Sequence, residues 1–184
     1  MYSVFIPFLS RSKSIQRCLN ALHENSVHKH EIVCTIGESD VYYAFNKGVY
    51  QAKYDKVILL NDDMIVSKGW DYPLLKHNNW ETITTGFVVE PSPGVNYRPN
   101  GEQISNIQLD CGSVENFDYD KFQTFVDGQT VPEFAQNEKG WYQPLVVNQR
   151  SFVTYPNIKK FPFHPNDITL IEEILPQAGY NFAR

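Results

Sequence analysis

Two adjacent carboxylates, Asp62 and Asp63, follow directly on the apolar run Lys56–Leu60. That run predicts a buried strand, and the chain becomes apolar again at Met64. Neighbouring carboxylates repel each other, so a cation, a basic side chain or solvent must offset their charge. Mg²⁺ typically binds one or two carboxylates together with substrate phosphates, which makes the pair a candidate metal site. A solvated turn, in which Asp62 caps the following segment, is the competing interpretation.

A second acidic position stands near the end of the sequence, where Asn166 and Asp167 begin a predicted helix that runs to about Leu175. The Asp167 carboxylate is a candidate general base, because a positioned carboxylate can take the proton of an attacking hydroxyl. Its other interpretation is the N-terminal cap of that helix. These residues alone favour the cap.

The first ninety residues alternate between helix-like and strand-like segments, and this framework would position the acidic pair. Helices are predicted around Ile15–Leu22, at Val41–Lys53 and at Gly69–Leu75. Strands are predicted at Ser3–Leu9, Glu31–Ile36, Lys56–Leu60 and Thr82–Val89. The alternation predicts an α/β fold with a mostly parallel central sheet flanked by helices. Such sheets bind ligands at the carboxyl ends of their strands, where Asp62 and Asp63 stand.

The rest of the sequence is less regular. Pro91–Gly140 is rich in Pro, Gly, Asn and Asp and has weak periodicity, so we expect either a functional loop region or structure that the sequence pattern reveals poorly. A strand is predicted at Leu145–Val153, and Gly179 fits the end of the last helix. No repeat or linker divides the 184 residues, and we expect one domain.

Composition limits the class of protein. The net charge of −5 argues against a dedicated nucleic-acid binder. No apolar run approaches the roughly 18 residues of a membrane span, so no transmembrane segment is expected. The three cysteines, Cys18, Cys34 and Cys111, are widely spaced and favour a reduced, cytoplasmic interior over a disulfide framework.

Several short blocks occur in an order that is similar to a known family. They are Tyr2–Phe8, Asn46–Gly48, Leu60–Asp63, Gly69-Trp70, Asn148–Phe152, Asn166-Asp167 and Ala178–Tyr180. Together they resemble inverting family 2 glycosyltransferases of the GT-A fold, a Rossmann-like fold that uses nucleotide sugars. The resemblance covers roughly residues 2–90 and 145–182. It implies one GT-A domain over 1–184, with a nucleotide-sugar-binding half at 1–90 and an acceptor-side half at 91–184.

The resemblance assigns donor-side roles to the acidic pair and its neighbours. The family's D-x-D element falls on Asn61-Asp62-Asp63, where Asn61 replaces the first acid. It implies that Asp63 binds Mn²⁺ or Mg²⁺ and that Asp62 and Asn61 contact the donor. Further donor or nucleotide contacts are implied at Pro7, Phe8, Arg11, Glu38, Asp40 and Asn46.

The resemblance also favours the general-base role of Asp167 over the helix-cap role. This residue matches the second member of the family's Glu-Asp pair, while Asn166 replaces the first, and general base becomes its expected role. His164 is a candidate for a further metal ligand, and a purely structural role is the competing interpretation. Weaker acceptor-side candidates are Cys111, Gly112, Trp141 and Arg150, and Trp70 is a candidate for stacking against a sugar or for core packing.

The function that follows is metal-assisted, inverting transfer of a sugar from a UDP, GDP or dTDP donor to a hydroxyl acceptor, for which a glycan is the first choice. Cytoplasmic glycan-assembly systems of bacterial or virus-infected cells are the expected setting. One alternative acceptor is a modified DNA base, for which Arg11, Lys13, Lys159 and Lys160 would form a basic rim. The acidic net charge disfavours it. Another alternative is a non-catalytic nucleotide- or sugar-binding domain, because Asn61 and Asn166 replace expected acids.

Overall fold

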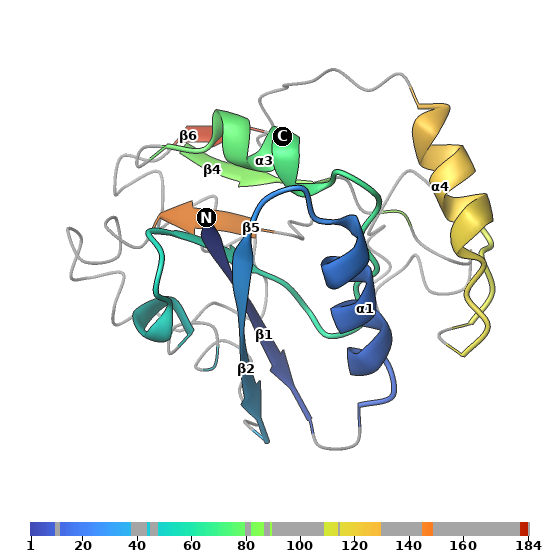
Figure 1. Ribbon diagram of the computed structural model, residues 1–184, viewed down its shortest axis with the longest axis horizontal. Helices are drawn as coiled ribbons and strands as arrows, with labels where there is room; N and C mark the ends of the chain where they lie inside the picture. Colours follow the sequence, from blue (N-terminus) through green and yellow to red (C-terminus); the bar gives the residue numbers. More distant parts are fainter. Residues whose placement is uncertain are drawn as a thin grey trace, which may run out of the picture.

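The computed structural model describes residues 1–9, 12–37, 44, 48–79, 82–86, 89, 109–113, 115–129, 145–148 and 181–183. Its strands are β1 (Tyr2–Phe8), β2 (His30–Ile36), β3 (Lys56–Leu59), β4 (Thr82–Thr85), β5 (Leu145–Asn148) and β6 (Asn181–Ala183). Its bounded helices are α1 (Ile15–Asn25), α3 (Asp71–His77) and α4 (Tyr119–Asp127). These elements form an α/β fold with one mixed sheet (Figure 1).

The sheet has the strand order β2-β1-β3-β5-β4-β6. Strand β1 pairs in parallel with β2 and β3, and β6 pairs in parallel with β4. Strand β5 lies between β3 and β4 and is antiparallel to both. Five described strands therefore point one way and β5 points the other, so the carboxyl ends of β1, β2 and β3 lie at a common edge.

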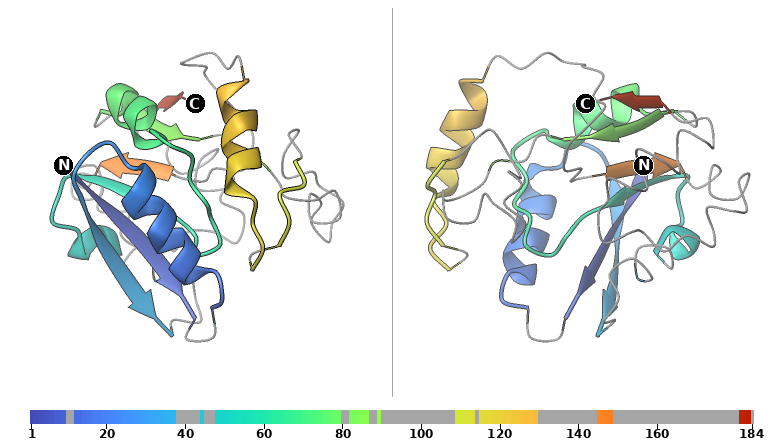
Figure 2. Two further views of the ribbon diagram at one scale, coloured as in Figure 1. Left: turned by 45° about the vertical axis from the view of Figure 1, so that its right-hand side comes forward. Right: turned by 180° about the vertical axis from the view of Figure 1, so that it is seen from behind.

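Strand β1 is buried on both faces, which explains its nearly continuous apolar sequence. Val4 and Ile6 belong to the same core cluster as Cys18 and Leu22 of α1, so this helix covers one face. Phe5 points the other way, toward helical residues 48–51. Figure 2 shows α4 outside α1, on the side away from the sheet.

Gly48 shows how closely the second layer approaches β1. A Cβ atom built on Gly48 would lie 2.1 Å from the ring of Phe5. Only glycine lets the helix backbone pack directly on this ring. The Asn46–Gly48 block of the sequence therefore contains a glycine that the packing requires at position 48.

A buried polar cluster holds the opposite end of the strands. The carboxylate of Asp71, at the start of α3, accepts hydrogen bonds from the backbone N–H groups of Val27 and His28, both at 2.9 Å. It also accepts one from the hydroxyl of Tyr2 at 3.1 Å. The cluster joins the loop before β2, the first residues of β1 and the start of α3.

Most of the predicted elements in the first ninety residues are confirmed, with changed boundaries. Strands β1, β2 and β3 and helix α1 lie where they were predicted, and residues 44 and 48–51 of the predicted helix at Val41–Lys53 are helical. Helix α3 begins and ends two residues later than predicted. Strand β4 ends at Thr85, so the prediction that it reaches Val89 is wrong.

Helix α4 lies within Pro91–Gly140, so the loop interpretation is wrong for this part of the stretch, and the interpretation as structure with a weak sequence pattern is confirmed there. The side chain of Asp118 caps this helix by accepting a hydrogen bond from the N–H of Lys121 at 3.0 Å. The predicted helix at Asn166–Leu175 lies outside the described residues. Within the part of the chain that the structure describes, no helix has the length and apolarity needed to cross a membrane.

Candidate functional site

The acidic pair lies in a tight turn directly after β3. Leu60 is fully buried, and its N–H donates to the carbonyl of Phe5 at 3.1 Å, so pairing with β1 continues to this residue. The N–H of Met64 then donates to the carbonyl of Asn61 at 3.3 Å, which closes a turn with Asp62 and Asp63 at its centre. The two carboxylates therefore lie at the carboxyl edge of the parallel strands, as the sequence predicted.

The loop before α1 reaches this turn through Ser12. The Ser12 hydroxyl donates a short hydrogen bond to Oδ2 of Asp62. The hydroxyl oxygen of Ser12 also accepts from the N–H of Ile15 at 3.3 Å and lies 3.1 Å from the hydroxyl oxygen of Ser14. Asp62 is thereby tied to the first turn of α1, and the bond through Oδ2 restricts the orientation of its carboxylate.

Asp63 is exposed to water, yet its carboxyl has a raised pKa. Burial by surrounding protein atoms is the larger cause, and the charge of Asp62 adds to it, while a backbone hydrogen bond acts in the opposite direction. A bound cation would relieve both unfavourable effects.

The buried side chain of Cys18 contacts the turn that contains the acidic pair. Its side chain is 1% exposed, and its thiol donates to the carbonyl of Asn61 across 3.8 Å. Burial, followed by the charges of Asp62 and Asp63, raises the pKa of this thiol to about 12. Cys18 is therefore a neutral thiol that packs under the turn.

The structure brings five of the predicted donor-side residues to one edge. Pro7 and Phe8 end β1, and the carbonyl of Phe8 accepts from the N–H of Gly37 after β2 at 3.1 Å. The turn with Asn61, Asp62 and Asp63 follows the neighbouring strand β3. The loops after β1, β2 and β3 thus start from the same side of the sheet.

Two acceptor-side candidates lie in a different turn, before α4. Cys111 is 3% exposed, and its carbonyl accepts from the N–H of Asp118 at 2.8 Å. Gly112 has φ of 84°, and a Cβ atom there would lie 2.5 Å from the carbonyl oxygen of Asn116. The turn itself explains why position 112 is glycine.

Trp70 packs in the core. It is 8% exposed, and its indole N–H donates to the hydroxyl of Ser26 at 3.0 Å. The core interpretation of this tryptophan is confirmed, and the stacking interpretation is not supported. Lys13, a member of the proposed basic rim for DNA, places its ammonium 3.9 Å from a carboxylate oxygen of Glu115.

The remaining site candidates lie outside the described residues. They are Arg11, Glu38, Asp40, Asn46, Trp141, Arg150, His164 and Asp167. Sequence reasoning missed Ser12 and Cys18. The pair of hydroxyls at Ser12 and Ser14 just before a predicted helix was the available signal, because such residues often bond to exposed groups at helix starts.

A hard divalent cation fits the donor atoms of the turn. Asp62 and Asp63 offer adjacent carboxylate oxygens, which Mg²⁺ and Mn²⁺ prefer. Among the described residues, no three His, Cys, Asp or Glu side chains gather into a group that could hold a metal ion. The pair therefore suits the open mode of binding, in which substrate phosphates and water supply the other ligands.

Comparison with known proteins supports the fold. No protein-family model matches the sequence, and a search of curated proteins finds no match. Among solved structures, the crystal structure of A197 from STIV aligns with a TM-score of 0.50 and 10% sequence identity. The alignment covers 100% of this chain and 81% of A197. At that identity the likeness concerns the fold, and it agrees with the α/β architecture of the described residues.

Proposed function

We propose that this chain is an inverting glycosyltransferase of the GT-A fold, which transfers a sugar from a nucleoside diphosphate donor to a hydroxyl acceptor. The observation that carries the proposal is the position of Asp62 and Asp63. Both lie in a turn at the carboxyl edge of parallel strands, and the loop before α1 contacts that turn through Ser12. Open α/β sheets bind their ligands at this edge.

The donor would occupy the edge where the loops after β1, β2 and β3 start. Pro7 and Phe8 would border the nucleotide, and Asp62 would contact its ribose or sugar. The carboxylate of Asp62 is already oriented by Ser12, which reduces the ordering that ligand binding requires. Arg11, Glu38, Asp40, Asn46 and His164 keep the donor or metal roles that the resemblance implies.

Asp63, with Asp62 beside it, would hold Mn²⁺ or Mg²⁺. When bound, the metal offsets the negative charge that gathers on the departing diphosphate. The raised pKa of Asp63 supports this assignment, because the crowding and repulsion that raise it call for a compensating positive charge.

Asp167 is the proposed base, on the strength of the sequence resemblance. It would take the proton of the acceptor hydroxyl as that oxygen attacks the anomeric carbon from the face opposite the diphosphate. The C–O bond to the acceptor forms while the bond to the diphosphate breaks, so the configuration inverts. Cys111, Gly112, Trp141 and Arg150 remain proposed acceptor-side residues.

Isothermal titration with UDP, GDP and dTDP, each with and without Mn²⁺, tests donor binding. We expect one diphosphate to bind in a Mn²⁺-dependent manner and Asp63→Asn to weaken that binding at least about tenfold. Asp55→Asn is the matched control, because Asp55 is exposed just before the other end of β3. Absence of binding by all three nucleotides, or an equal affinity in Asp63→Asn, would contradict the proposal.

A further inference from the structure

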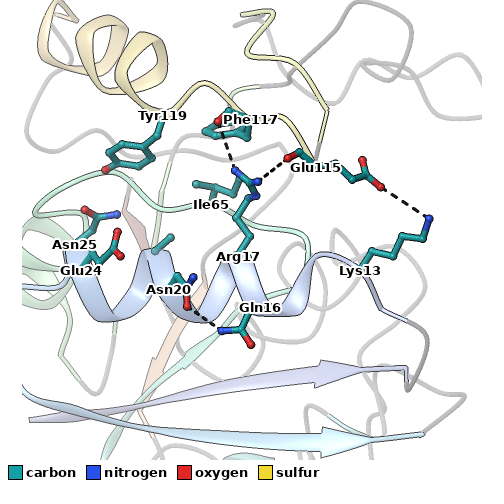
Figure 3. A pocket seen from close by; sticks show the side chains of 11 residues that line it. Lys13, Gln16, Arg17, Asn20, Glu24, Asn25, Ile65, Glu115, Phe117 and Tyr119 are labelled. Atoms are coloured by element: carbon teal, nitrogen blue, oxygen red, sulfur yellow. Dashed lines mark hydrogen bonds and ion pairs between the residues drawn. The ribbon is translucent and has the colours of Figure 1, made fainter.

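A shallow groove of about 420 Å³ lies along the outer face of α1. One wall is the helix, and the other is the stretch that leads into α4 (Figure 3). Its volume falls within the range of about 300–1,000 Å³ that is usual for small-molecule sites. Of the residues given a role above, only Lys13, a member of the alternative basic rim for DNA, lines it.

The helix wall carries a row of polar side chains. Gln16, Asn20 and Glu24 are spaced four residues apart, so they lie along one line of α1. All three are exposed. The amide of Gln16 donates to the amide oxygen of Asn20 at 2.9 Å, which leaves the Asn20 amide hydrogens and the Glu24 carboxylate to face a ligand.

The opposite wall is aromatic. Phe117 and Tyr119 line the groove from the side of α4, and both are half-buried. The ring of Phe122 packs edge-on against each of them, with centroid separations of 5.7 and 6.0 Å. The Tyr119 hydroxyl donates to Gln123 at 2.9 Å. These contacts hold the aromatic wall in place before any ligand arrives.

The two cations in the groove are already engaged. Arg17 crosses from α1 to the opposite wall and donates to the carbonyls of Glu115 at 2.9 Å and Phe117 at 3.4 Å (Figure 3). Lys13 lies 3.9 Å from the Glu115 carboxylate. Glu24 adds a negative charge, so the groove has no surplus positive charge with which to attract a phosphate or a nucleic acid.

These features match a neutral, polyhydroxylated ligand. Amides and carboxylates exchange hydrogen bonds with hydroxyl groups, and an aromatic ring offers a flat apolar surface to the C–H face of a pyranose. The groove also begins beside the acidic turn. Lys13 follows Ser12, which contacts Asp62, and Ile65 comes two residues after Asp63.

We propose that this groove binds a neutral oligosaccharide, with one pyranose ring against Tyr119 and its hydroxyls on Asn20 and Glu24. In the enzyme proposed above, on which this role rests, the groove would hold a remote part of a glycan acceptor while another part enters the catalytic site. The groove is shallow and half polar, so the expected affinity is weak, with a Kd of about 1 mM.

The test is a ¹H–¹⁵N NMR titration of the full chain with maltotriose, mannotriose and N,N′,N″-triacetylchitotriose, without donor or Mn²⁺. We expect at least one trisaccharide to cause saturable shifts at α1 residues 16–24 and at 117–119. Tyr119→Ala should weaken binding about tenfold, while Tyr119→Phe, which keeps the ring, should bind as the wild type does. Asn20→Ala, an exposed change that leaves the core intact, should also weaken it.

The control aromatic is Tyr72, which is 51% exposed on α3. Tyr72→Ala should leave trisaccharide binding unchanged. The proposal is overturned if no trisaccharide gives saturable shifts, if Tyr119→Ala and Asn20→Ala bind as the wild type does, or if inorganic phosphate shifts the same residues. This titration contains neither donor nor metal, so its result is independent of the nucleotide titration described above. If the chain binds a trisaccharide but no nucleotide, the proposed enzyme is contradicted and the proposed oligosaccharide site is supported. If the chain binds a nucleotide but no trisaccharide, only the proposed oligosaccharide site is contradicted.

Discussion

Ser12 donates a hydrogen bond to the carboxylate of Asp62 across fifty residues of sequence. This contact joins the loop before α1 to the turn after β3, two segments that start from neighbouring strands. It restricts one oxygen of the carboxylate that would contact the donor. The candidate site is therefore partly organised without its ligand, and Ser12 is the residue that does this for Asp62.

Replacing Ser12 should weaken donor binding without unfolding the chain. A partner that orients a ligating carboxylate is typically worth about 10–100-fold in affinity. We expect Ser12→Ala to reduce Mn²⁺-dependent nucleotide affinity by that factor in isothermal titration. Ser14→Ala separates the two hydroxyls, because Ser14 lies 3.1 Å from the Ser12 oxygen and makes no side-chain cap bond to α1, while the bond to Asp62 comes from Ser12. Equal affinity in Ser12→Ala and the wild type would show that this contact does not organise the site.

The Asp63 carboxylate should favour metal and nucleotide binding but lower the stability of the metal-free chain. Its pKa is raised, first by burial and then by Asp62, so the charge on this carboxylate is less favourable in the folded chain than in the unfolded chain. Asp63→Asn removes that charge, and we expect it to raise the midpoint of urea unfolding of the metal-free chain at pH 7 while it weakens nucleotide binding. A lower midpoint would mean that the Asp63 carboxylate stabilises the fold through contacts other than a bound cation.

Asp71 should make stability depend on acid pH. Burial alone would raise its pKa, but hydrogen bonds from the backbone of Val27 and His28 and from the side chains of His28 and Tyr2 outweigh burial and hold it below the ordinary 3.8. A lowered folded-state pKa contributes stability that is present above the unfolded value and is lost as the pH falls through the folded value. Urea unfolding between pH 7 and pH 3 should therefore show stability falling below about pH 4.

The variant Asp71→Asn isolates this contribution. It keeps the shape but loses the charge that several donors contact, and hydrogen bonds to a charged group are worth about 1.5–3 kcal/mol. We expect Asp71→Asn to lower the free energy of unfolding by at least that amount at pH 7. Its stability should also fall less than that of the wild type as the pH decreases. If Asp71→Asn and the wild type lose stability in parallel between pH 5 and pH 3, other carboxylates cause the acid sensitivity.

Gly48 should tolerate no side chain. A Cβ atom at this position would overlap the ring of Phe5, and overpacking of a core typically costs about 1–3 kcal/mol. We expect Gly48→Ala to lower the free energy of unfolding in urea by that amount, and Phe5→Leu to recover part of the loss in the double variant. Gly128→Ala is the control, because its Cβ would meet its neighbours at an ordinary 3.5 Å. Unchanged stability in Gly48→Ala would mean that Phe5 can move aside.

The sequence predicted the elements whose signal is local. Strand β1 is an apolar run because both of its faces are covered, and α1 shows helical spacing at Ile15, Leu19 and Leu22. The position of Asp62 and Asp63 followed from the same logic, since a parallel strand that ends in carboxylates places them at the ligand-binding edge.

Other features depend on tertiary contacts that no local pattern reveals. The Ser12–Asp62 bond needs two distant segments to meet, and the direction of β5 depends on its partners β3 and β4. Helix α4 carries Tyr119, Phe122 and Val126 at helical spacing after its cap at Asp118, but it is short, has no fully buried residue and lies in a stretch rich in Pro, Gly, Asn and Asp, so its signal was missed. The groove along α1 arises only because the stretch before α4 packs against that helix.

Turnover of donor tests the central claim most directly. Purified chain is incubated with Mn²⁺ and a panel of UDP, GDP and dTDP sugars, and release of the nucleoside diphosphate is measured. We predict release from at least one donor, its loss in Asp63→Asn and Asp167→Asn, and its retention in Asp55→Asn. No release from any donor, or release that persists undiminished in both Asp63→Asn and Asp167→Asn, would contradict the assignment of this chain as a metal-assisted glycosyltransferase.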